Sequence, residues 1–215
     1  KRDKRVLTLM FFVLIFFGAF RAYSVGTDAA NYSSYYLRIG TSDDIFSIIT
    51  SAPVYSIYNK LLYMIFPYRQ AILISNSIII LVGIAYFIYN YSEDVCFSTI
   101  LYIVSYSYCF SFNGMRQCIA MSMVLVALCW SEKKYKFRSI ILLLLAIGIH
   151  NTAIFGLLSI PFVRKRMDAK TTRYVFVGSI IGMIILKYGY DFIINLFINI
   201  FPRYAMYINS CKIGV

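Results

Sequence analysis

A few charged side chains interrupt long apolar stretches of this 215-residue sequence, and their types suit the binding of an anion. Arg116 is the second residue of one apolar stretch, His150 lies in the middle of another, and Arg21 and Asp28 follow a third. Ionisable groups at bilayer depth are costly and usually face a polar cavity. Because arginine can bind a phosphate group through two parallel N–H donors, this set predicts a site for a phosphate-bearing ligand.

Three of these residues also have an ordinary structural explanation. Arg21 could extend its side chain to the headgroups at a membrane surface. Asp28 could cap the start of a helix, and His150 could hydrogen-bond a neighbouring helix. The turn signal Asn113-Gly114 does not explain Arg116, which lies two residues into an otherwise uninterrupted apolar helix.

The composition predicts that most of the chain lies in lipid. Hydrophobic residues make up 60% of the sequence and charged residues only 14%, whereas about a quarter of the residues of a soluble domain are charged. The net charge of +12 comes largely from clusters at Lys1–Arg5, Glu132–Arg138 and Arg164–Arg173. Such clusters are typical of the cytoplasmic loops of membrane proteins, so we exclude nucleic acid as a partner and expect contact with membrane lipid.

Six apolar runs are long enough, or nearly so, to cross a bilayer as helices. None shows the alternation of a barrel strand. The predicted fold is therefore all-α, a polytopic transmembrane bundle that forms a single domain over residues 1–215. We expect the chain to be a piece of a longer protein. The runs are Val6–Phe20, Ala71–Tyr91, Val95–Phe112, Met115–Ser131, Ser139–Val163 and Tyr174–Phe201.

The fifth run, Ser139–Val163, conflicts with the charge rule if it crosses the membrane once. Starting from a cytoplasmic Lys1–Arg5, a single crossing would place the most basic cluster, which begins at Arg164, outside. A break at Gly148–Thr152, around His150, would return Arg164 to the cytoplasm through a broken or re-entrant helix. Each half would be about 17 Å long, which is short for a full span. The alternative is one long, tilted helix followed by a basic outer loop.

The region between the first two runs is too polar to span a membrane. Pro53–Tyr63 carries apolar residues at helical spacing beside a polar stripe, which predicts an amphipathic helix on the outer interface. In this topology several polar residues gather at the outer side. These are Arg21, Asp28, Asn113, Arg116, Gln117, His150, Lys187 and Arg203.

Three segments in order carry a family resemblance. They are FRAYSVGTDAANY at Phe20–Tyr32, NGMRQCIA at Asn113–Ala120 and IHNTA at Ile149–Ala153. Their order and spacing resemble those of EpsG-type exopolysaccharide polymerases, which are relatives of the Wzy O-antigen polymerases. The resemblance covers residues 20–160. Beyond Arg164 little of it remains, so the roles of Lys187 and Arg203 rest on topology alone.

The resemblance implies a glycosyltransferase of the bacterial cytoplasmic membrane. Such an enzyme would move a growing glycan from undecaprenyl pyrophosphate to the next lipid-linked repeat unit on the outer face. Arg116 and Arg21 would stabilise the departing pyrophosphate, and either Asp28 or His150 would be the general base. The predicted substrate-binding residues are Arg21, Tyr32, Asn113, Gln117 and Arg203.

The expected ligand is the lipid-linked oligosaccharide, and we expect no cofactor. We also expect no metal, because the five cysteines form no CxxC pair and, with a single histidine, give no zinc-type spacing. Other envelope polysaccharide assembly proteins are possible partners. Two alternatives of a different class stay open. A flippase for lipid-linked sugars would show paired repeats with a second broken helix, and a membrane acyltransferase acting on surface glycans would need an acyl-donor site. A structural membrane subunit would leave Arg116 and His150 unexplained.

Overall fold

A computed structural model describes residues 3–43, 52–133, 135–159 and 168–200 of the chain. Within these ranges the structure is helical and contains no β-strand. Residues 1–164 and 165–215 form two compact units, and each is described by itself. The helices of the first unit are α1 (Lys4–Ala19), α2 (Ala29–Thr41), α3 (Pro53–Ile65), α4 (Ala71–Tyr91), α5 (Val95–Val104), α6 (Ser107–Phe110), α7 (Met115–Glu132), α8 (Lys136–Ile149), the 3₁₀-helix η1 (Asn151–Ile154) and α9 (Phe155–Ser159).

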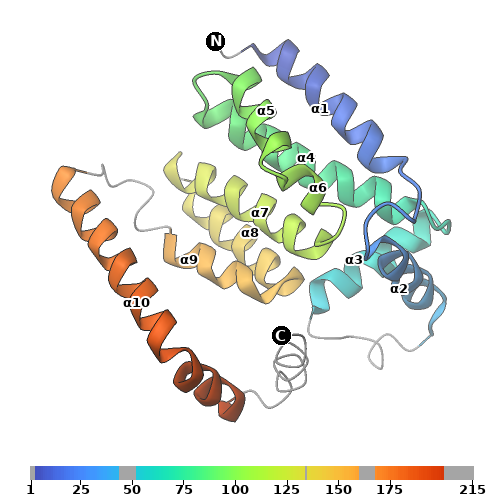
Figure 1. The fold of residues 1–215 in the computed structure, drawn as a ribbon. Helices are drawn as coiled ribbons and strands as arrows, with labels where there is room; N and C mark the ends of the chain where they lie inside the picture. Colours follow the sequence, from blue (N-terminus) through green and yellow to red (C-terminus); the bar gives the residue numbers. More distant parts are fainter. Residues whose placement is uncertain (1–2, 44–51, 134, 160–167, 201–215) are drawn as a thin grey trace. The chain divides into compact units, whose positions relative to one another are not determined.

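The centre of the first unit is α4, which packs against both α1 and α7, while α8 packs against α7 (Figure 1). The Gln70 side chain donates to the Ala19 carbonyl at 2.6 Å, so the end of α1 meets the start of α4 and the two helices are antiparallel. At the opposite end of α4, Lys133 donates to Asn90 at 2.6 Å, so α4 and α7 end together and are parallel. These are the directions expected if the first four runs cross a membrane in alternation from a cytoplasmic Lys1–Arg5. A bilayer crossing by each helix stays a prediction.

Two helices in the described ranges are long and apolar enough to span a membrane. One is α4, which coincides with the predicted run Ala71–Tyr91. The other is the segment Ala169–Gly189 of α10 (Ala169–Ile200), the helix of the second unit, which overlaps the predicted run Tyr174–Phe201. Both fit the predicted membrane protein.

Helix α3 of the first unit buries polar side chains and exposes several large apolar ones. In α3 the buried positions include Ser56 and Asn59, whereas Leu61 and Met64 are 57% and 72% exposed. The predicted amphipathic helix is therefore present, with its polar stripe against the protein. In lipid, helices associate through packing and hydrogen bonds and not by hiding apolar surface, so this inverted pattern suits a membrane environment.

The contacts of α4 with its neighbours depend on small residues. Gly18 of α1 faces Ser77, and a Cβ atom at Gly18 would lie 3.1 Å from the Ser77 hydroxyl. Gly83 of α4 faces Ser122 of α7, and a Cβ atom at Gly83 would lie 2.9 Å from the Ser122 Cβ. Small residues let two helix backbones approach closely, a common arrangement between membrane helices.

The prediction of one continuous run over Val95–Phe112 is wrong, because the structure divides it into α5 and the short α6. Tyr106, between them, has a left-handed backbone with φ 66°. The neighbouring Ser105 hydroxyl hydrogen-bonds the Ser107 hydroxyl at 2.9 Å and donates to the Tyr102 carbonyl at 3.3 Å. Side chains that bond locally in this way compete with the helical ladder, which accounts for the break.

The fifth predicted run is not one continuous helix in the structure. Helix α8 ends at Ile149, His150 is extended with φ −151° and ψ 121°, and η1 and α9 follow. A re-entrant course through a membrane stays a prediction. Arg164, on which that prediction depends, lies outside the described residues, as does Arg203.

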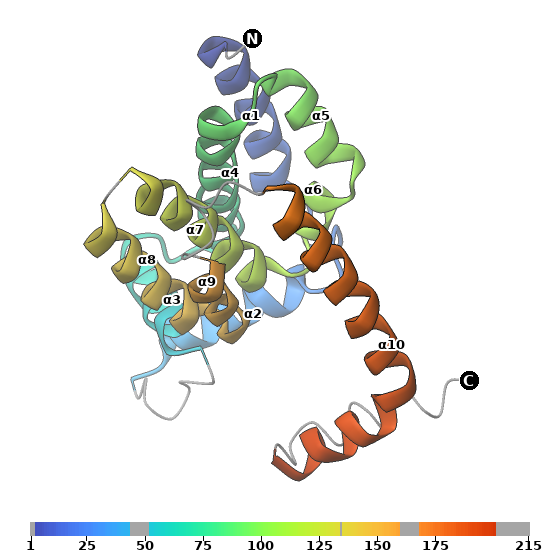
Figure 2. The same ribbon diagram turned by 90° about the vertical axis from the view of Figure 1, so that its left-hand side faces the viewer.

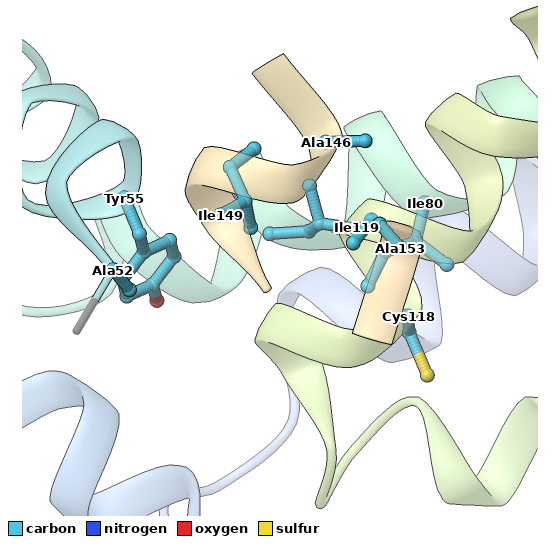
Figure 3. Packing of buried hydrophobic residues seen from close by; sticks show 9 residues of the cluster. Ala52, Tyr55, Ile80, Cys118, Ile119, Ala146, Ile149 and Ala153 are labelled. Carbon is cyan, nitrogen blue, oxygen red and sulfur yellow. The ribbon is translucent and has the colours of Figure 1, made fainter. Parts of the chain in front are cut away.

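Figure 3 shows the apolar cluster that joins the ends of α3, α7 and α8. Tyr55 of α3 and Ile119 of α7 are almost completely buried in it, together with Ile149 at the end of α8. Figure 2, turned by a quarter, shows α2 and α3 at one end of the α4, α7 and α8 group. The cluster therefore fixes the polar segment α2–α3 to one end of the bundle.

We predict that Gly83→Ala destabilises the protein by about 1–3 kcal/mol, because the added methyl group must push α4 and α7 apart. Gly178→Ala in α10 is the matched control, since a Cβ atom there meets nothing within 4 Å and alanine favours a helix over glycine. Thermal unfolding of the purified protein in detergent measures both variants. Equal unfolding temperatures for Gly83→Ala and the unaltered chain would contradict the close contact.

Candidate functional site

A polar cavity of about 620 Å³ lies at the end of the first unit that holds α2 and α3. Its charged lining residues are Asp28, Arg38 and Arg116, which come from the start of α2, from within α2 and from the start of α7. The remaining lining residues are neutral polar or aromatic. They are Asn31, Tyr32, Ser34, Tyr35 and Tyr55.

Helix α2 places its lining residues on one face by simple periodicity. Asp28, Tyr32, Tyr35 and Arg38 are spaced by four, three and three residues, which is the spacing of one side of an α-helix. The residue directly after each of them is buried, and these four buried residues are Ala29, Ser33, Tyr36 and Ile39. Amphipathic spacing therefore turns one polar face of α2 into a wall of the cavity.

The side chains of Arg116 and Asp28 face this cavity without a hydrogen bond or ion pair to any other described residue. Asp28 precedes α2 as its cap residue, yet its side chain makes no capping hydrogen bond. The guanidinium of Arg116 lies 5.9 Å from the centre of the Tyr55 ring, a distance at which a cation and an aromatic face attract each other. A cation and a carboxylate are thus both free to bind a ligand in the same space.

The aromatic floor beneath Arg116 is held by a buried amide. Tyr55 accepts a hydrogen bond from the Asn76 amide at 3.3 Å, and Tyr58 donates to the Asn76 carbonyl oxygen at 3.0 Å. Burial is the largest cause that raises the pKa of Tyr55, so its hydroxyl group stays neutral. The same Asn76 amide also lies 3.5 Å from the sulfur of Met115, the residue before Arg116.

Asn113 holds the loop that leads to Asp28. Its side-chain oxygen accepts from the backbone N–H of Thr27 at 2.7 Å and from the Thr27 hydroxyl at 3.2 Å. Gly26, one residue earlier, has φ +98°, and a Cβ atom there would lie 2.7 Å from the Phe112 carbonyl oxygen. The predicted substrate-binding residue Asn113 therefore contacts the protein itself and positions the loop before Asp28.

Arg21 is not among the residues that line the cavity. It is only 8% exposed and its guanidinium donates to the Gly18 carbonyl, to the Ser77 hydroxyl at 3.4 Å and to the Met115 sulfur at 3.6 Å. It also lies 4.6 Å from the centre of the Phe112 ring. These contacts join the end of α1 to α4 and α7, so Arg21 supports the helix start that carries Arg116.

The other predicted residues divide between the cavity and its surroundings. Tyr32 lines the cavity. His150 is half-buried and close enough to Arg116 for their charges to interact, but it is not a lining residue. Gln117 lines a different cavity, of about 320 Å³, together with Tyr102. Among the residues that the structure describes, no three histidine, cysteine, aspartate or glutamate side chains gather as a metal ion would require.

Arg38, Tyr35 and Tyr55 line the cavity but are not among the site residues predicted from the sequence. For the first two a signal existed, because they continue the helical spacing of Asp28 and Tyr32. Tyr55 carries no comparable signal, since its place beneath Arg116 depends on how α3 packs against α4 and α8.

The described part of the chain is thus an all-helical membrane protein with a charged, aromatic cavity at one end of a helix bundle. A model of the EpsG family matches residues 4–213. Because the match covers nearly the whole chain, the protein belongs to the EpsG family, which is associated with polysaccharide biosynthesis. No curated protein and no solved structure matches the chain.

We predict that Asn113→Ala speeds hydrogen–deuterium exchange at the amide of Thr27, because that amide loses its acceptor. Asn113→Asp keeps an acceptor oxygen and should exchange like the unaltered protein. Asn90→Ala, at the opposite end of α4, is the control for a lost side-chain amide. Unchanged exchange across residues 24–29 in Asn113→Ala would show that Asn113 does not hold this loop.

Proposed function

We propose that the protein is an exopolysaccharide polymerase that transfers a growing glycan from a lipid diphosphate to a lipid-linked repeat unit, on the outer face of the bacterial cytoplasmic membrane. The observation that carries the proposal is the presence of Asp28 and Arg116, both unpaired among the described residues, in one cavity. Membership of the EpsG family supports the same class of reaction.

In the proposed reaction, the bond between the anomeric carbon of the donor sugar and the diphosphate oxygen breaks, and the diphosphate leaves with the electron pair. The hydroxyl oxygen of the acceptor sugar forms the new bond to that carbon. Arg116 would stabilise the charge that develops on the departing diphosphate, because a fixed cation in a water-poor site acts strongly on such charge.

Asp28 is the proposed general base that takes the proton of the acceptor hydroxyl. It lines the same cavity as Arg116, and no capping bond occupies its carboxylate. His150 is half-buried and is not among the residues that line the cavity, which favours a supporting role over proton transfer. The aromatic rings of Tyr32 and Tyr35 offer apolar surfaces on which sugar rings can pack.

We predict that Asp28→Asn lowers polymer formation by at least about a hundredfold, because the amide cannot accept the proton. The amide and the carboxylate are similar in size and in capping ability, so the fold should persist. Asp94→Asn is the matched control, since Asp94 caps α5 away from the cavity. His150→Ala should retain more activity than Asp28→Asn.

The measurement is the length of the glycan ladder made by membranes supplied with lipid-linked repeat units, with expression matched by blotting. A normal ladder from Asp28→Asn and a missing ladder from His150→Ala would transfer the role of base to His150. Normal ladders from both variants would overturn the proposed use of the cavity in catalysis.

We predict that Arg116→Lys slows polymerisation on the order of a hundredfold while weakening substrate binding much less. Lysine keeps the positive charge but loses the planar pair of donors that fits two phosphate oxygens. An interaction that strengthens in the transition state is lost mainly from turnover. Arg138→Lys, at the start of α8, is the control. Equal losses in binding and in turnover would assign Arg116 to substrate binding alone.

A further inference from the structure

The cavity holds a second guanidinium, that of Arg38, for which the family resemblance provides no role. Arg38 lies one turn beyond Tyr35 on α2, and its guanidinium is 5.6 Å from the centre of the Tyr35 ring. The side chain is exposed to the cavity. Among the described residues it forms no hydrogen bond or ion pair, so its N–H donors are available to a ligand.

The two arginines of the cavity are held in similar ways. Arg38 lies by the Tyr35 ring and Arg116 by the Tyr55 ring. These two rings are themselves stacked, with centres 6.2 Å apart and an angle of 11° between their planes. A hydrogen bond of 2.7 Å between the hydroxyls of Tyr35 and Ser56 fixes α2 to α3 beside the stack. One aromatic pair therefore connects two cations from helices that are distant in sequence.

The charge of the lining favours an anion with more than one phosphate group. Arg38 and Arg116 supply two positive charges and Asp28 one negative charge. A guanidinium beside an aromatic ring keeps its in-plane N–H groups for hydrogen bonds, and one planar fork suits one phosphate group. A monophosphate would leave one of the two forks without a partner, whereas a diphosphate presents oxygens to both.

We propose that Arg38 and Arg116 together bind the diphosphate of a lipid-linked sugar, and that Arg38 gives the cavity its preference for a diphosphate over a monophosphate. This inference rests on the proposed function, because it assigns the second cation to the same substrate. Arg38 binds one phosphate group from α2 while Arg116 binds the other from α7.

The experiment compares ligand binding to the full-length protein in lipid nanodiscs. The ligands are a polyprenyl diphosphate, the matching polyprenyl monophosphate and uridine diphosphate, which carries the same diphosphate without a lipid. The unaltered protein should prefer the polyprenyl diphosphate. Arg38→Gln should weaken diphosphate binding roughly tenfold or more, as expected for one lost charge-assisted contact, and should leave monophosphate binding nearly unchanged. The affinity of Arg38→Lys for the diphosphate should lie between those of the unaltered protein and Arg38→Gln.

Arg138→Gln is the matched control, because Arg138 is also exposed and lies 5.4 Å from a tyrosine ring, that of Tyr135, but outside the cavity. If Arg38→Gln binds the diphosphate as tightly as Arg138→Gln does, the inference is overturned. A preference for uridine diphosphate over the polyprenyl diphosphate would overturn the proposal that the bound diphosphate is lipid-linked.

The proposed function can fail independently of this inference. If the unaltered protein makes no glycan ladder but binds the polyprenyl diphosphate through Arg38, the inference stands and the polymerase proposal falls. A ladder that is lost in Arg116→Lys, together with unchanged diphosphate binding in Arg38→Gln, would leave the polymerase proposal in place and remove the role of Arg38.

Discussion

The buried side-chain amide of Asn76 connects the helices on which the rest of this structure depends. It is only 1% exposed and lies in the second turn of the apolar helix α4. An unpaired amide buried there would cost on the order of several kcal/mol. Its partners are Tyr55 and Tyr58 of α3 and Met115 of α7. Because these partners come from two other helices, satisfying one amide fixes the end of the bundle at which Arg116 begins α7.

The same end of the bundle is stabilised from the opposite side by Arg21. Its guanidinium also reaches Met115, and it ties this residue to Ser77 of α4 and to the last turn of α1. Met115 is fully buried between Asn76 and Arg21, and the next residue points into the cavity. The start of α7 is therefore defined by polar contacts inside an otherwise apolar bundle. In lipid, hydrogen bonds between helices act together with packing to associate them, so such contacts add to the specificity of the arrangement.

The sequence allowed much of the helical framework to be predicted, but less of the site. The run Ala71–Tyr91 coincides with α4 because apolar composition and length determine a long helix almost by themselves. The break at Tyr106 could not be predicted, since it depends on how Ser105 and Ser107 bond locally within an apolar run. Arg21 has the residue type of a ligand-binding group, and only the three-dimensional contacts reveal that its two terminal amino groups donate to other parts of the protein.

Helix α2 shows why a polar segment can carry a site that a search for apolar runs overlooks. Its spacing is helical, yet its composition is too polar to resemble a membrane span. A search by hydropathy therefore does not detect the face formed by Asp28, Tyr32, Tyr35 and Arg38. Placed beside a bilayer, such a helix keeps charged groups at the depth of lipid headgroups, where their desolvation is less costly than in the hydrocarbon core. A lipid-linked diphosphate carries its charge at that depth. A cavity formed by α2, α3 and the first turn of α7 can therefore meet the phosphates without drawing them into the hydrocarbon.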